Sequence, residues 1–488
     1  MKNILKWVGI GIGILVVIVV GIGVYGYIDI NSNFRAAEKT AIEPGLIPTG
    51  IEETIAFTNI SVIPMDSERI LEKQTVIIEN GRIAQLGSSM EIFPPDKATI
   101  IDGTNCFLIP GLSDMHVHLL GSENDLLLYL ANGVTTIRDM GDGPPEYLDW
   151  RDQIKAGTRT GPNLWVWSPS IREVQEMGDK IATMFPVTGM VNINTPEKAE
   201  KLVAKFADQG YDGIKAKFIH SVEINKAIIK AADRHGLPFD GHIPEDLWYG
   251  PDKGFPCEDR IACWNEFLSM DLPAVAHIGE LIRTLKRTDE GIQQAAQDVA
   301  DEGTWVTSTV FLFRSITDQI ADLEGELAKP EVAFVNPSHF VREEWLSGDN
   351  AYSEVDSSLH SEYLAVLEKM LLALYEAGVP LMSGTDTPLP IMIPGFALHE
   401  ELEVMVDIGL SPYDALKTST HNPAMYLGEL DEFGTIEVGK RADLVLLKAN
   451  PLVDITNTQL IDGVMVRGRW YTRADLDMML EEVANANN

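Results

Sequence analysis

Residues 110–118 read PGLSDMHVH, an apolar run that ends with histidines at alternate positions. In a β-strand, alternate side chains point to the same face, so His116 and His118 would aim at one point. Two neutral imidazoles that converge in this way make half of a metal site. Such a pair on its own is more often a pair of surface histidines, so the rest of the chain has to decide.

Four further candidate site residues follow later in the chain: Lys215, His242, His277 and Asp386. Each closes a short apolar run that is followed by loop-like residues, which is typical of the carboxyl end of a buried parallel strand. An α/β barrel carries its chemistry at this end of its strands. The pattern therefore favours a barrel whose first strand carries His118.

The intervals between these residues can be compared with a (β/α)8 barrel, in which each unit of strand, loop and helix takes about 31 residues. Lys215 lies 97 residues after His118, which fits strand 4, and His242, 27 residues further, fits strand 5. His277 then falls on strand 6. Asp386 lies 109 residues after His277 and fits strand 8 if roughly fifty extra residues are inserted before it. We assign this insertion to the acidic stretch 315–362.

Together, these motifs resemble the amidohydrolase superfamily, in particular its secreted imidazolonepropionase-like and prolidase-like metal-dependent hydrolases. The resemblance extends from about residue 53 to about residue 480. Its most specific parts are the stretch 110–118, Ile214-Lys215, GHIP at 241–244, SGTD at 383–386 and GKRADL at 439–444. One departure is Ala276, because relatives often carry a glutamate before the histidine that corresponds to His277.

The resemblance implies that Lys215 reacts with CO2 to become a carbamate whose two oxygens bridge two metal ions. Lys217 shares the same face of the strand, so carboxylation of Lys217 stays open as an alternative. Without the resemblance, Lys215 would be explained as a barrel lysine paired with a carboxylate. The match at Ile214-Lys215 favours Lys215 as the modified residue.

The resemblance also implies a ligand set for two divalent ions. The ligands of the first ion would be His116, His118, the modified Lys215 and Asp386. The ligands of the second ion would be the modified Lys215, His242 and His277. Imidazole and carboxylate ligands suit zinc best, with manganese, cobalt or iron as alternatives. In isolation, His242 or His277 is better explained as a buried packing histidine.

The function that this centre implies is hydrolysis of a C–N bond other than a protein peptide bond. A hydroxide that bridges the two ions would attack the amide carbonyl of a dipeptide such as Xaa-Pro, or of an N-acyl amino acid. Asp386 would be the catalytic acid and base, taking the proton of the water and passing it to the leaving nitrogen. A lactone, a cyclic amide or a carbamate is the alternative substrate, and a catalytically inactive scaffold or interaction protein is the alternative of another class.

Two further residues are candidates for substrate contacts. Arg138 follows the apolar run 134–137, and its guanidinium would bind a substrate carboxylate through two hydrogen bonds. The alternative for Arg138 is a structural pair with a nearby acid. His399 lies beside Glu400 and Glu401, after Asp386, and its alternative is a structural role.

The predicted fold class is α/β, a (β/α)8 TIM barrel with a small composite β-sandwich and an N-terminal transmembrane helix. Asn80-Gly81, between two runs that alternate in the strand manner, predicts a hairpin. Strand patterns return at 442–448 and 464–471, and the resemblance implies that both flanks of the barrel combine into the sandwich. The predicted divisions are a cytoplasmic N-terminus 1–6, an anchor 7–28, a linker 29–52, sandwich parts 53–109 and 434–475, the barrel 110–433 and a tail 476–488.

Composition limits the partners. The chain has 73 Asp and Glu against 38 Lys and Arg, a net charge of −35, which excludes nucleic acid and anionic lipid headgroups. The expected partner is a small amide or dipeptide substrate. Cys257 and Cys263 are candidates for a disulfide in an oxidising compartment, with unpaired thiols as the alternative.

Residues 7–28 contain no charged side chain and follow Lys2 and Lys6. This run exceeds the apolar region of a signal peptide, about 7–15 residues, and suits a membrane core about 30 Å thick. It predicts a single-pass protein of the cytoplasmic membrane with its catalytic part outside the cytoplasm, in a periplasm or at the cell surface. A cleaved signal peptide is the alternative. Gly9 and Gly13 form a G-x-x-x-G, which is compatible with a homo-oligomer.

Overall fold

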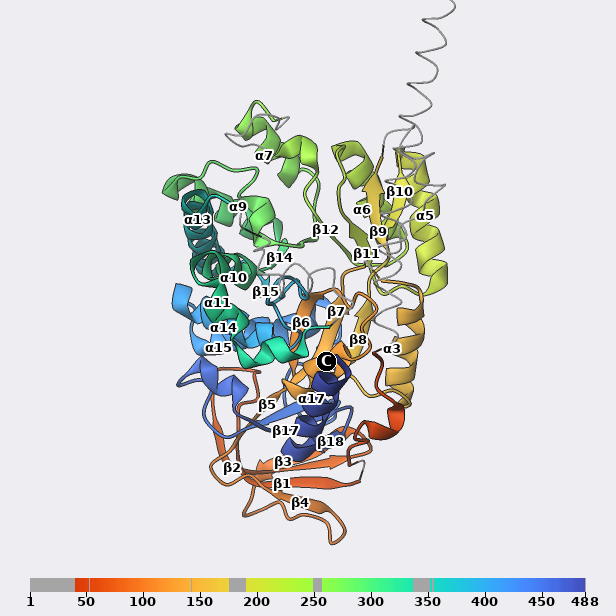
Figure 1. The fold of residues 1–488 in the computed structure, drawn as a ribbon, viewed down its shortest axis with the longest axis vertical. Helices are drawn as coiled ribbons and strands as arrows, with labels where there is room; N and C mark the ends of the chain where they lie inside the picture. Colours follow the sequence, from red (N-terminus) through yellow and green to blue (C-terminus); the bar gives the residue numbers. More distant parts are fainter. Residues whose placement is uncertain are drawn as a thin grey trace, which may run out of the picture.

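The computed structural model describes residues 40–487 except 52, 142, 175–189, 249–256, 337–351, 353 and 354. Strands from both ends of the chain lie together at one end of the molecule, and the strands and helices from the middle of the chain occupy the rest (Figure 1). The larger of two hydrophobic clusters fills the central part and extends onto the terminal sheet, where it includes Ile109, Val445 and Val464, and the smaller cluster lies within that sheet.

The terminal sheet has eight strands and joins the two flanks of the chain. Phe107–Pro110 pairs antiparallel with Leu444–Leu447, so segments far apart in sequence share one sheet. Glu79 pairs with Arg82 across Asn80-Gly81, which confirms the predicted hairpin. The strands are β1 (Ile55–Val62), β2 (Leu71–Glu79), β3 (Arg82–Ser88), β4 (Thr99–Asp102), β5 (Phe107–Pro110), β16 (Leu444–Leu447), β17 (Ile461–Val466) and β18 (Arg469–Thr472).

Eight parallel strands follow one another around the central part. Two isolated parallel bridges, Trp167 with Gly213 and Val117 with Thr387, connect the two sheets that contain these strands. The ring is consistent with the predicted (β/α)8 barrel. Its strands are β6 (Leu112–Val117), β7 (Val134–Asp139), β8 (Asn163–Val166), β11 (Ile214–Ala216), β12 (Phe239–Gly241), β13 (Ala274–Val275), β14 (Trp305–Thr307) and β15 (Leu381–Met382), while β9 (Ser170–Glu173) and β10 (Met190–Ile193) extend the sheet beside β11.

The helices around the ring have the sequence features of amphipathic surface helices. In α5, for example, Ala199, Val203 and Phe206 are buried and lie on one face. Proline at the first position and Gly210 in the left-handed conformation after the last turn set the two ends of this helix. The helices are α2 (Asp125–Ala131), α3 (Glu146–Ala156), α5 (Pro196–Gln209), α6 (Val222–Arg234), α7 (Arg260–Leu268), α8 (Ile278–Leu281), α9 (Asp289–Glu302), α10 (Val310–Ala321), α11 (Leu323–Leu327), α13 (Ser357–Glu376), α14 (Phe396–Ile408), α15 (Pro412–Thr418), α16 (His421–Tyr426) and α17 (Arg473–Asn487), with 3-10 turns η1 (Pro44–Leu46), η2 (Glu245–Leu247), η3 (Pro330–Phe334) and η4 (Ile455–Gln459).

Two of the long connections between barrel strands, those after β12 and after β14, differ in character. The connection after β12 carries α7, and there a disulfide joins Cys257 to Cys263 within this helix. The connection after β14 carries α10, α11 and η3 within the predicted insertion, and then α13. The C-terminal helix α17 returns to contact α2, β17 and β18, so it lies between the barrel and the terminal sheet (Figure 1).

The predicted localisation has to be corrected. Across the part of the chain that the structure describes, the search for a helix both long and apolar enough to span a membrane finds none. The predicted anchor 7–28, and with it Gly9 and Gly13, lies outside the described residues. A single-pass anchor is therefore not supported.

Candidate active site

The six predicted metal ligands lie at the carboxyl ends of the barrel strands, which we call the barrel mouth. His116 is on β6 and His118 follows it; Lys215 is on β11. His242 directly follows β12, and His277 comes two residues after β13. Asp386 comes four residues after β15, the last strand of the ring. These are the strands on which the sequence intervals place the residues, so the barrel brings together side chains from five strands.

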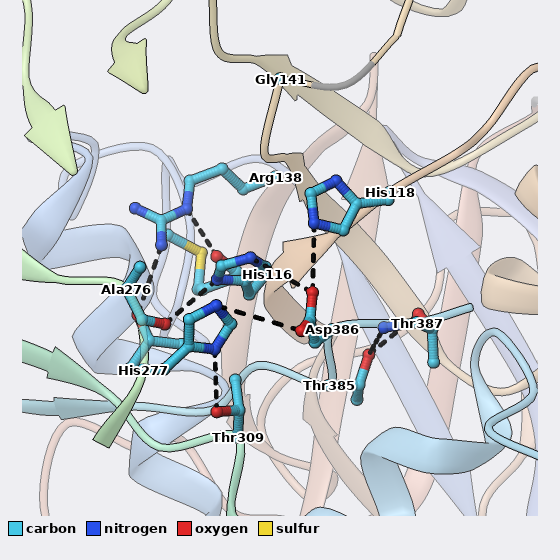
Figure 2. Close-up of polar contacts among 12 residues, drawn as sticks. His116, His118, Arg138, Gly141, Ala276, His277, Thr309, Thr385, Asp386 and Thr387 are labelled. Carbon is cyan, nitrogen blue, oxygen red and sulfur yellow. Dashed lines mark hydrogen bonds and ion pairs between the residues drawn. The ribbon is translucent and has the colours of Figure 1, made fainter. Parts of the chain in front are cut away.

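Asp386 lies at the centre of a group of imidazoles (Figure 2). Its Oδ1 is 3.1 Å from Nε2 of His118 and 3.5 Å from Nε2 of His116, and its Oδ2 is 4.0 Å from Nε2 of His277. The ligand atoms of His116, His118 and Asp386 all lie within 4.8 Å of one another, which is close enough for them to hold one metal ion.

Two of the histidines, His116 and His277, are oriented through their Nδ1 atoms. Nδ1 of His116 lies 3.1 Å from the carbonyl oxygen of Ala276, and Nδ1 of His277 lies 3.1 Å from the hydroxyl of Thr309 (Figure 2). A carbonyl oxygen only accepts, so Nδ1 of His116 carries the proton and its Nε2 presents a lone pair. This arrangement of one ring nitrogen held by the protein and the other presented to the site is typical of metal-ligating histidines.

Buried histidine nitrogen atoms without hydrogen bonds also fit a metal centre. Nε2 of His116 and Nε2 of His242 are buried and make no hydrogen bond within the described part of the chain. Burial lowers the pKa of His116 and of His277, which favours the neutral imidazole, the form that binds metal. A metal ion would satisfy buried nitrogen atoms that the protein itself leaves without hydrogen bonds.

Asp386 is held as a carboxylate by its surroundings. Burial raises its pKa, but the nearby His277 and the hydrogen bond from His118 outweigh burial and bring the pKa below its usual range. Its backbone adopts a left-handed conformation with φ 59°, and its amide nitrogen donates to the carbonyl oxygen of His116 at 2.7 Å. The loop after β15 is thereby fixed directly to the strand that carries the first two histidines.

A buried carboxyl group, that of Asp114, reinforces this junction. It accepts hydrogen bonds from the backbone nitrogen of Thr385 at 3.1 Å and from the Thr385 hydroxyl at 2.7 Å. The backbone nitrogen of His116 donates to the same carboxyl at 3.3 Å. Burial raises the pKa of Asp114 to about 7. Asp114 therefore connects the backbone of the predicted ligand His116 to Thr385, which precedes the predicted ligand Asp386. The sequence analysis did not identify this role of Asp114.

Glu280 is a second residue that sequence reasoning missed. Its Oε1 lies 3.5 Å from Nδ1 of His242, and its Oε2 accepts from the backbone nitrogen of Ile243 at 3.2 Å. Burial raises the pKa of Glu280, but His242 and Arg283 outweigh burial, and the pKa falls to about 2. A carboxylate three residues after His277 thus orients the neighbouring histidine. The signal available in the sequence was the absence of a glutamate directly before His277, at Ala276, with Glu280 three residues after His277.

Lys215 is enclosed in the barrel wall, where it is 1% exposed. Its backbone nitrogen donates to the hydroxyl of Ser168 at 3.2 Å. Gly141 provides the room beside it, because a Cβ added there would lie 3.2 Å from Cβ of Lys215 and 2.1 Å from the carbonyl oxygen of Ser168. Lys217, by contrast, lies beyond the end of β11 and is only half-buried.

Arg138 is not at the barrel mouth, and the expectation of a substrate contact is corrected. The side chain is fully buried, with Nη2 2.7 Å from Oδ2 of Asp240 and Nε donating to the carbonyl oxygen of Met115 at 2.6 Å. Its guanidinium also stacks between the rings of Trp167 and Tyr426, at 5.0 and 5.1 Å from their centroids. Arg138 therefore forms the structural pair with an acid that was the alternative.

Replacing Arg138 by Met is expected to destabilise the fold by about 3–5 kcal/mol, because the charge of Asp240 would stay buried without its partner. Denaturant unfolding followed by fluorescence would measure the loss. The double variant Arg138→Met, Asp240→Leu should recover most of it, since neither charge then remains buried. A single variant as stable as the parent would contradict the assignment.

His399 is also enclosed, so the expectation of a substrate contact is corrected here too. It lies on α14 and is 2% exposed. Nδ1 is 2.9 Å from the hydroxyl of Thr458 and Nε2 is 3.0 Å from the carbonyl oxygen of Asn132, so both ring nitrogens are engaged. Burial lowers its pKa to about 4. His399 joins the barrel to η4, which is the structural role named as its alternative.

Comparison with known proteins identifies the family. The model of the Amidohydrolase family matches residues 107–471. A 5-methylthioadenosine/S-adenosylhomocysteine deaminase from Carboxydothermus hydrogenoformans is 26% identical over 220 residues, which is 40% of this chain and 50% of that protein. The imidazolonepropionase of Geobacillus sp. (strain WCH70) is 22% identical over 418 residues, 81% of this chain and 89% of that protein.

A solved structure agrees with these matches at the level of the fold. A Xaa-Pro dipeptidase with methionine bound in its active site superimposes with a TM-score of 0.64 and 20% identity, over 86% of this chain and all of that one. The family match spans most of the chain, from the start of β5 to β18. The chain belongs to the amidohydrolase family of metal-dependent hydrolases that act on C–N bonds, as its motifs predict.

Proposed function

We propose that this enzyme hydrolyses the amide bond of a small substrate, either a dipeptide such as Xaa-Pro or an N-acyl amino acid. The reaction takes place at a centre of two metal ions, for which zinc is the preferred metal. The observation that carries the proposal is the convergence of the Nε2 atoms of the histidines on Asp386. The residues that would hold the ions are His116, His118, His242, His277, Asp386 and Lys215 as its carbamate.

Burial supports Lys215 rather than Lys217 as the carboxylated residue. Lys215 is on a barrel strand, and its charge is close enough to contribute to the lowered pKa values of His116, His242 and His277, each of which burial lowers most. Carboxylation of Lys215 would replace its positively charged ammonium group by a negatively charged carbamate, close to the proposed ligands of both metal ions. That change removes the repulsion that an ammonium group would exert on bound metal.

The ions, when bound, would activate a water molecule and polarise the carbonyl group of the substrate. Asp386 would accept the proton of that water on a carboxylate oxygen and return it to the nitrogen of the leaving group. Its pKa lies below the usual range, so the group begins as a carboxylate, the form that can accept a proton. His118, 3.1 Å from Oδ1, fixes the carboxylate in place.

The experiment that tests this proposal measures metal content and substrate range together. The full chain would be produced with zinc and bicarbonate, its metal content determined, and its activity assayed on dipeptides and N-acyl amino acids beside lactones, cyclic amides and carbamates. About two ions per chain with amide hydrolysis is the expected result. A protein without bound metal, or one that hydrolyses only lactones or carbamates, would overturn the proposal.

Replacing Glu280 by Gln is expected to weaken metal binding about 10-fold to 100-fold, because His242 loses the carboxylate that orients it. Competition with a chelator would measure the affinity. Glu266→Gln, an exposed glutamate on α7 that pairs with Lys226, is the matched control and should bind metal like the parent. Unchanged affinity in Glu280→Gln would rule out this orienting role.

A further inference from the structure

The turn that follows β11 is fixed rigidly against its neighbour β9. The backbone nitrogen of Lys217 donates to the carbonyl oxygen of Ile171 at 2.9 Å, and that of Glu173 donates to the carbonyl oxygen of Phe218 at 3.1 Å. The carboxylate of Glu173 then accepts from the backbone nitrogen of Ser221 at 2.7 Å. Residues 217–221 are thus fixed by hydrogen bonds to β9 and form a wall of the barrel mouth.

Phe218 has two unusual features within this wall. Its φ of 57° places a bulky side chain in the left-handed region, which is unfavourable for residues other than glycine. Its ring is 44% exposed, and the ring centroid lies 6.4 Å from that of the predicted ligand His242. Backbone strain that presents an aromatic ring to solvent beside a site indicates a functional role for that ring.

The charge of Lys217 lies at the same wall. Its Nζ is 5.4 Å from the centroid of the Phe218 ring. That ring in turn lies beside the imidazole of the predicted ligand His242, with 6.4 Å between the two centroids. An ammonium group and an exposed aromatic ring are therefore presented together at the edge of the site.

Two other cations near the site, Arg138 and Arg283, make structural contacts. Arg138 is buried below the mouth with Asp240, 2.7 Å away. Nη1 of Arg283 donates to Oε1 of Glu280 at 3.0 Å, and its guanidinium lies 4.5 Å from the Trp248 ring centroid. Lys217 differs from both in that its ammonium group lies against the ring of Phe218, which is 44% exposed.

We propose that Lys217 binds a carboxylate group of the substrate and that the ring of Phe218 packs against an apolar part of the same molecule. This inference rests on the proposed function and narrows it to amides that carry a carboxylate, as dipeptides and N-acyl amino acids do. Neutral cyclic amides, lactones and carbamate esters offer Lys217 no partner of opposite charge, so they are poor substrates.

The test compares paired ligands on the metal-loaded enzyme. Alanyl-proline and N-acetyl-methionine would be assayed beside their C-terminal amides, for hydrolysis and for binding by calorimetry. The proteins are the parent, Lys217→Gln, Lys217→Arg and Phe218→Ala, with Lys226→Gln as the matched control, an exposed lysine on α6 that pairs with Glu266. Thermal unfolding would establish that each variant is folded.

Lys217→Gln is expected to raise KM and Kd for the carboxylate ligands about 10-fold to 100-fold, with little change in kcat, and to leave the amides unaffected. Lys217→Arg should restore much of the affinity because it keeps the charge, and Phe218→Ala should weaken both members of each pair. Equal use of acids and amides by the parent, or equal losses for both in Lys217→Gln, overturns the inference. A different result would contradict the proposed function itself: the parent enzyme would hydrolyse none of these amides.

Discussion

Replacing Asp386 by Asn is expected to lower kcat about 100-fold to 10,000-fold, the range that a positioned acid and base contributes. The amide of asparagine cannot accept the proton of the attacking water, although it preserves the size of the side chain and can still offer an oxygen to a metal ion. Steady-state kinetics on the best amide substrate would measure the loss, and metal analysis would show whether the ions are retained.

Asp289→Asn is the matched control for this variant. Asp289 lies in the first turn of α9 with a side chain that is 83% exposed, and it pairs with Lys369 at the surface. This control should keep the activity of the parent. If Asp386→Asn bound its metal and kept near-parental kcat, the proton would have to be carried by another group.

Replacing Lys215 by Ala is expected to lower kcat/KM by about 1,000-fold or more, because the stabilisation that a metal ion gives to the reaction amounts to several kcal/mol. In the proposed centre the variant would lack the carbamate of Lys215, so the metal content should fall with the activity. Acetate, a small carboxylate that fits the space left by the lysine side chain, should restore part of both. Metal analysis and kinetics at increasing acetate concentration would follow the recovery.

Lys217→Ala distinguishes the two candidate lysines in the same experiment. It should retain the metal content of the parent and gain nothing from acetate, because Lys217 is expected to bind substrate rather than metal. Loss of metal in Lys217→Ala, together with normal metal content in Lys215→Ala, would reverse the assignment of the carbamate.

The positions of the candidate ligands could be predicted because of a simple constraint. A parallel strand of a barrel is buried on both faces and therefore appears in the sequence as a short apolar run. The chemistry of the fold lies at the ends of such runs. His116, Lys215, His242, His277 and Asp386 each mark such an end, so their spacing was enough to assign them to strands.

The directions and partners of individual side chains could not be predicted in the same way. The alternation of side chains along β7 predicts the face of the strand to which Arg138 points. It does not predict whether Arg138 lies in the barrel interior or at the barrel mouth, that is, its level along the barrel axis. The level depends on the stagger of neighbouring strands, which brings Asp240 of β12 beside it. An arginine that was a candidate for substrate binding is thereby part of the core.

The sequence by itself determined the family and pointed to His116, His118 and Asp386, whose ligand atoms lie close enough to hold one ion, because these depend on local patterns of burial and on residue type. Only the tertiary structure decided how those residues are held. The carbonyl of Ala276 orients His116, Glu280 orients His242, and His399 is enclosed against η4. Such contacts join segments that the barrel brings together from distant parts of the chain, and their geometry follows from strand stagger and loop conformation rather than from spacing.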